Sequence, residues 1–166
     1  AALCGRIYAH IREANLPAAV IKGIELDVLR YASVPEPSPH QLRWQISLLY
    51  AAGELARTQG RLIQASNFYS ECAARDALHY SPLLGNKTLD SLFWLARFAL
   101  TRNDPEAARA YLQRSIHESN RLVSGSWLNI VGSLAEPLAF GLAEVSQLFD
   151  KAARAAYMLQ VIDKFR

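Results

Sequence analysis

Residues 48–74 read LLYAAGELARTQGRLIQASNFYSECAA, and this stretch decides the fold class. Its apolar residues recur three and four positions apart, which is the spacing of one face of an α-helix. Good helix formers, chiefly Ala, Leu, Glu, Arg and Gln, fill the positions between them. Gln59 and Gly60 interrupt the pattern once, as a turn between two helices would. The stretch therefore predicts a helical hairpin.

The same helical spacing continues along the rest of the chain, and no segment alternates as a strand would. We expect an all-α protein with helices near residues 2–14, 17–32, 39–58, 61–79, 88–102, 105–121, 125–135 and 138–164, arranged as four antiparallel pairs. Proline is tolerated in the first turn of a helix, so Pro17, Pro105 and Pro137 are interpreted as helix starts. Asp104 is the expected N-cap before Pro105. The proline-rich residues 33–39 are interpreted as a spacer or an insert and not as a domain boundary.

The composition predicts one domain over residues 1–166. The chain has 166 residues, 51% of them hydrophobic and 20% charged, which is enough for a continuous core. Its net charge of +3 comes from interspersed signs, so a nucleic acid partner is not expected. Cys4 and Cys72 form no CxxC pair. No apolar run is long enough to span a membrane, and no charged start followed by a short apolar stretch marks a signal peptide. We expect a soluble, cytoplasmic protein with no membrane partner, and, because the chain begins without Met, a fragment of a longer one.

A second hairpin can be laid over the first, with small residues again where two helices must approach closely. The matching positions of the first are Leu49, Gly53, Ala56, Gly60, Leu62, Ala65, Tyr69 and Cys72. Those of the second are Leu92, Ala96, Ala99, Asn103, Pro105, Ala108, Leu112 and Ser115. Residues 46–79 and 89–122 therefore resemble tetratricopeptide repeats (TPR), although they lie further apart than the period of about 34 residues of that family. The resemblance implies antiparallel helical hairpins stacked as a TPR-like α-α superhelix.

The resemblance also implies a groove lined by the first helix of each pair. Its groove offsets fall on Ser47, Tyr50, Glu54, Arg57 and Thr58 in one repeat, and on Asp90, Phe93, Arg97, Leu100 and Thr101 in the other. We take Tyr50, Glu54, Arg57, Asp90, Phe93 and Arg97 as the candidate partner-binding residues, because aromatic and Arg side chains are common interface anchors. Packing residues and a solvated surface are the alternatives. Related domains that grip a terminal carboxylate place Lys and Asn where Tyr50 and Glu54 stand, so that clamp is not predicted.

No catalytic or metal-binding pattern is evident, so neither an enzyme nor a cofactor is expected. His10, His40, His79 and His117 have no metal-ligand spacing, and the glycines form no phosphate loop. Trp44, Trp94 and Trp127 are expected in the core. The leading hypothesis is a scaffold that binds a protein or peptide, with self-association through the C-terminal helices as a further expectation. The alternatives are a ligand-sensing regulatory domain of a transcriptional or signalling regulator and, less favoured, a nucleic-acid-binding repeat.

Overall fold

A computed structural model describes residues 1–13, 15–77, 84–124 and 138–165. Within these ranges the regular structure is α-helical and no strand occurs, so the all-α prediction is confirmed. The helices are α1 (Ala2–Ile11), α2 (Ala18–Ala32), α3 (Pro39–Thr58), α4 (Leu62–Ala74), α5 (Gly85–Thr101), α6 (Pro105–Ser124) and α8 (Leu138–Lys164).

The helix ends agree with the expected ones to differing degrees. Helices α3 and α8 have the expected bounds, whereas α4 ends at Ala74 instead of near residue 79 and α5 begins three residues early, at Gly85. The start of α3 is fixed by a capping box: the Gln41 amide donates to Ser38 Oγ over 3.3 Å, and the Ser38 amide donates to Gln41 Oε1 over 2.9 Å. Three expectations lie outside the described residues: the helix at 125–135, the helix start at Pro137 and the core position of Trp127.

The two hairpin turns follow from local backbone chemistry. Gly60, between α3 and α4, has a φ of +72°, a conformation that glycine adopts without steric cost. Asn103, between α5 and α6, has a φ of +58°, and Asn is among the residues that tolerate this region best. Asp104 then caps α6 as predicted, since its Oδ1 accepts a hydrogen bond of 2.9 Å from the Ala107 amide.

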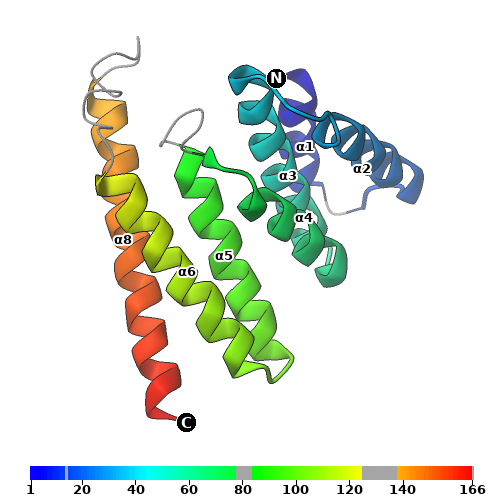
Figure 1. Cartoon of the computed structure of the whole chain (residues 1–166). Helices are drawn as coiled ribbons and strands as arrows, with labels where there is room; N and C mark the ends of the chain where they lie inside the picture. The colour runs from blue at the N-terminus through cyan, green and yellow to red at the C-terminus, as the bar shows by residue number, and fades with distance from the viewer. Residues whose placement is uncertain (14, 78–83, 125–137, 166) are drawn as a thin grey trace.

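Helices α3, α4, α5, α6 and α8 follow one another in a row, and α1 and α2 both lie against α3 at the end of that row (Figure 1). Helix α3 packs on α4, α4 on α5, α5 on α6, and α6 on α8, while α5 also contacts α8 and, more lightly, α3. The first expected pair is different. Helices α1 and α2 each pack on α3 but contact each other little, so they do not form the tight hairpin that the pattern predicted. The physical reason is that α1 buries one residue, Ile7, and this side chain belongs to the core around α3.

The core runs along this row of helices. Its largest cluster joins α1 through α5, a second joins α5, α6 and α8, and a third consists of Leu89, Leu122 and Leu148. Gly53 of α3 lets α4 approach closely, because a Cβ at that position would lie 2.7 Å from Cε1 of Tyr69. The turns and the small residues therefore place α5 between α3 and α8, where it contacts both.

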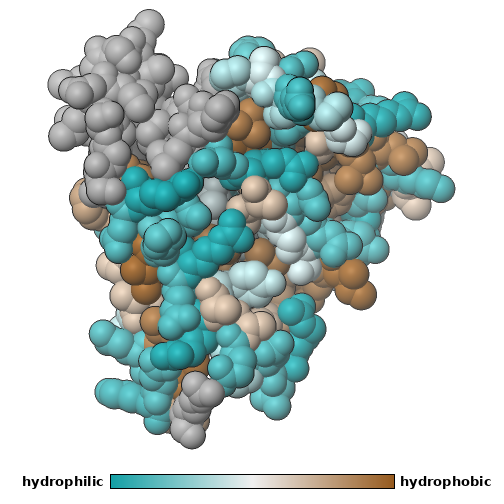
Figure 2. Space-filling model, in the orientation of Figure 1, coloured by the Kyte–Doolittle hydropathy of each residue, from teal (hydrophilic) through white to brown (hydrophobic). Residues whose placement is uncertain are grey.

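The face shown in Figure 2 is mainly hydrophilic, with apolar side chains gathered over α2. The exposed apolar residues of α2 are Val20, Leu26 and Leu29. None of the helices in the described ranges combines the length and apolar character that a membrane-spanning segment requires.

Candidate functional site

The candidate residues come from two neighbouring helices. Tyr50, Glu54 and Arg57 follow one another at helical spacing on α3, and Asp90, Phe93 and Arg97 do so on α5. All six reach solvent to some extent, whereas Ser47 from the same set of offsets is buried. Ser47 is therefore a packing residue, contrary to its predicted place in the groove.

Trp94 of α5 connects the two sets. The Arg57 guanidinium carbon lies 4.2 Å from the centre of the Trp94 ring, and that of Arg97 lies 4.8 Å from the same ring. Arg97 is also 5.9 Å from the centre of the Phe93 ring, and Arg154 of α8 is 3.8 Å from it. We call this alternation of cations and rings, Arg57, Trp94, Arg97, Phe93 and Arg154, the arginine–aromatic ladder. Guanidinium groups stacked on rings keep their N–H groups, which lie in the guanidinium plane, free to bind anions.

Glu54 fixes one end of the ladder. Its carboxylate accepts hydrogen bonds from Arg57 Nε, at 3.3 Å, and Arg57 Nη2, at 2.8 Å, and a further one from the Tyr69 hydroxyl of α4. The bond to Glu54 raises the pKa of Arg57 above its usual value. Burial, and then the same carboxylate, raise the pKa of Tyr69, so the phenol remains a proton donor. Arg57 is thus held in place by a satisfied network.

Asp90 fixes the other end by binding α8. Lys151 Nζ lies 2.8 Å from Asp90 Oδ2, and Arg154 Nη2 lies 3.5 Å from Asp90 Oδ1. Lys151 also donates to the backbone carbonyl of Asn86 over 3.4 Å. Because Lys151 and Arg154 are one turn apart on α8, both face α5. The surface therefore spans α3, α5 and α8.

The surface carries more positive than negative charge. Four cations, Arg57, Arg97, Lys151 and Arg154, share it with the carboxylates Glu54 and Asp90. Arg97 is exposed, and among the residues that the structure describes it has no carboxylate partner. A carboxylate or phosphate of a partner could accept hydrogen bonds from it.

Four residues of this surface were not predicted as site residues. Trp94 was expected in the core, and it does pack against the core, but it is only partly buried and also contacts the two guanidinium groups. Tyr69 was recognised only as the aromatic packing position of its repeat. Lys151 and Arg154 lie outside both predicted repeats, so no groove offset identified them. The spacing of two cations one helical turn apart was the single available signal for them.

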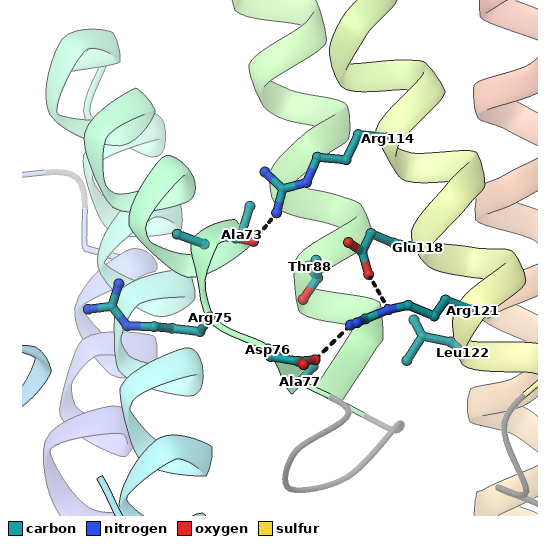
Figure 3. Close-up of a pocket in the computed structure, with 10 residues that line it drawn as sticks. Ala73, Arg75, Asp76, Ala77, Thr88, Arg114, Glu118, Arg121 and Leu122 are labelled. Carbon is teal, nitrogen blue, oxygen red and sulfur yellow. Dashed lines mark hydrogen bonds and ion pairs between the residues drawn. The ribbon is translucent and has the colours of Figure 1, made fainter. Parts of the chain in front are cut away.

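A separate small cavity of about 150 Å³ lies where the end of α4 meets α5 and α6 (Figure 3). Arg121 bridges two carboxylates there, 2.6 Å from Asp76 and 3.1 Å from Glu118, and Arg114 donates to the Ala73 carbonyl at the end of α4. Thr88 of α5 lines this cavity. It is 4% exposed, and its hydroxyl has no hydrogen-bond partner within the described part of the chain.

The sulfur of Cys72 lies in the core, and the possible metal ligands among the described residues do not gather in one place. Cys72 is fully buried, and burial raises its pKa to about 11, so the thiolate that a nucleophile requires is scarce near neutral pH. Across residues 1–13, 15–77, 84–124 and 138–165, no group of three or more His, Cys, Asp or Glu residues is placed to hold a metal ion.

Comparison with protein-family models, with curated proteins and with solved structures finds no match to this chain.

Proposed function

We propose that this chain is a TPR-like helical scaffold that binds a protein or peptide partner on the surface formed by α3, α5 and α8, and that it is not an enzyme. The burial of the repeat positions supports the fold assignment. Of the repeat positions that lie in helices, Leu62 and Pro105 are exposed and the others are buried. The buried ones are Leu49, Gly53, Ala56, Ala65, Tyr69, Cys72, Leu92, Ala96, Ala99, Ala108, Leu112 and Ser115. Such small and large residues at fixed offsets are what stacked hairpins require.

The arginine–aromatic ladder is the observation that carries the functional proposal. Trp, Tyr and Arg dominate the energetics of protein interfaces because they combine a large contact area with directional polar contacts. Here such residues form a continuous row on three helices and stay partly exposed. A row of ordered anchors costs little conformational entropy when a partner binds.

Affinity capture from a native lysate tests the proposal. The immobilised chain is compared with Arg57→Glu/Arg97→Glu and with the control Lys22→Glu/Arg30→Glu, which makes the same charge change at exposed positions of α2. We expect proteins retained by the native chain and by the control to be lost with the ladder variant, provided that circular dichroism shows equal helicity. Equal retention by all three would contradict the proposal.

A ligand-sensing regulatory domain is the second candidate, and the cavity beside Thr88 favours it. A buried hydroxyl without a partner is costly, and a bound small molecule or water could satisfy it. Thermal denaturation with a panel of amino acids and small anions tests this function. A ligand that stabilises the native chain but not Thr88→Val would support it, and no stabilisation of the native chain would count against it.

A further inference from the structure

The seam between α5 and α8 carries two features at a fixed spacing. Arg154 of α8 lies over Phe93 of α5. Seven residues later in both helices, Val161 and Leu100 line one cavity. The equal steps mean that α5 and α8 run in the same direction, and seven helical residues correspond to about 10 Å along the axis.

The first feature of the seam is the cationic end of the ladder. Arg97 is held against Trp94 and Phe93 and has no carboxylate partner among the described residues. Arg154 is held by Phe93 and lies 3.5 Å from an oxygen of Asp90, so one carboxylate serves both Arg154 and Lys151. A negatively charged group of a ligand would supply the anion that Arg97 lacks and that Arg154 shares with Lys151.

The second feature is an apolar cavity of about 460 Å³. It is lined by Leu100, Asn103, Pro105, Val161, Ile162 and Phe165. Leu100 is 38% exposed, Val161 37% and Phe165 87%, so the lining of this cavity exposes apolar surface to solvent. A large apolar side chain placed there would recover hydrophobic free energy from both partners.

We propose that the α5–α8 seam binds an acidic peptide segment in an extended conformation. An Asp or Glu side chain of the segment binds Arg97 and Arg154, and a large apolar side chain about three residues away fills the cavity beside Leu100, because an extended chain advances about 3.3 Å per residue. This inference rests on the proposed function and names the chemistry of the partner.

The same contacts disfavour a nucleic acid as the occupant. Bases bind to protein by stacking on open aromatic faces. Trp94 and Phe93 are each in contact with two guanidinium groups, so a base would have to displace a cation from the ring. Glu54 and Asp90 also lie within the surface, where they would repel a continuous phosphate backbone.

Selection from a random peptide library displayed on phage, followed by fluorescence anisotropy with an enriched peptide, tests the inference. The enriched peptide is compared with its amide form, in which Asp and Glu become Asn and Gln. We expect the amide form to bind about tenfold more weakly to the native chain, since a charge-assisted hydrogen bond contributes about this much. Arg97→Gln should remove the difference, and Arg30→Gln on α2 should preserve it.

The apolar part of the inference has its own matched pair. Leu100→Ser should weaken binding of the enriched peptide about tenfold, as loss of a buried apolar contact does, whereas Leu29→Ser, at a similarly exposed position of α2, should leave it unchanged. Both variants expose a hydroxyl on a helix surface, so their helicity is comparable.

Each remaining outcome decides a separate claim. Enriched peptides whose amide forms bind equally well would overturn the acidic ligand class and leave peptide binding in place. The absence of any enriched peptide would overturn this inference, whereas the proposed function is decided separately by the affinity capture with the Arg57→Glu/Arg97→Glu variant. Tighter binding of single-stranded oligonucleotides than of the enriched peptides, falling steeply with salt, would assign the surface to nucleic acid instead.

Discussion

At the scale of single residues, two glycines in helices have opposite roles. A Cβ at Gly53 would lie 2.7 Å from Tyr69, whereas a Cβ at Gly23 of α2 meets no atom within 4 Å. We expect Gly53→Ala to lower the free energy of unfolding by about 1–3 kcal/mol, because Tyr69 is buried and bonded to Glu54. Gly23→Ala should raise it by about 0.5–1 kcal/mol through helix propensity alone. Urea denaturation of both variants measures the difference, and equal signs would refute this account of Gly53.

The buried thiol of Cys72 predicts a dependence of stability on pH. Its pKa is raised to about 11, while a thiol in the unfolded chain has a pKa of about 8.5. The folded pKa is the higher one, so the contribution of this group is complete below about pH 8.5 and is lost as the pH rises towards 11. The free energy of unfolding should therefore fall in this window by up to about 1.4 kcal/mol per pH unit.

Cys72→Ala isolates this contribution. Urea denaturation at about pH 8 and about pH 10 should show a smaller loss of stability in Cys72→Ala than in the native chain. The tyrosines Tyr50 and Tyr69, whose pKa values are also raised by burial, add to the loss in both proteins only as the pH approaches 10. An equal loss in both proteins would mean that the thiol does not ionise differently on unfolding.

At the scale of helices, the cap of α6 gives a quantitative test of how the second hairpin begins. Asp104 Oδ1 accepts the Ala107 amide directly after the turn at Asn103. Asp104→Ala should lower the free energy of unfolding by about 1 kcal/mol, whereas Asp104→Asn, an equally good cap, should change it by only a few tenths. Thermal denaturation of the two variants provides the comparison. A large loss with Asn would show that the negative charge, and not the hydrogen bond, is what matters.

The sequence predicted the helix ends and turns that are determined by residues close to them in the chain. Ser38 and Gln41, Gly60, and the pair Asn103 and Asp104 each act within a few residues, so the bounds of α3 and the two turns were close to expectation. The packing of α1 was not predictable in this way, since Ile7 is buried against a helix more than thirty residues away in the chain.

The candidate surface was predictable only in part for the same reason. Aligning the two predicted repeats assigns positions on α3 and α5, but it cannot find α8, which follows both of them and resembles neither. Arg154 and Lys151 join the surface through Phe93 and Asp90, contacts that depend on how α8 packs on α5. Trp94 was interpreted as a core residue because periodicity alone does not show that Arg57 covers its ring.

At the scale of the whole molecule, the row of helices has an unequal distribution of buried residues. Helix α3 has 11 buried residues and α5 has 10, whereas α1 has one. Where most contacts of a helix are with adjacent helices, stability is close to a sum of local terms, so poorly buried ends open first. The surface on α3 and α5 therefore lies on the best-packed part of the molecule.

Native-state hydrogen exchange tests this gradient. Amides of α3 and α5 should exchange most slowly, through global unfolding, and those of α1 should exchange much faster through local opening. Ile7→Ala should accelerate exchange in α1 while leaving α5 unchanged, because Ile7 is the only buried residue of α1. Leu92→Ala, in the interior of α5, should accelerate exchange in every helix. If Ile7→Ala instead accelerated exchange in α5 as much as in α1, the described helices would unfold as one cooperative unit, and the proposed binding surface would share the stability of the weakest helix.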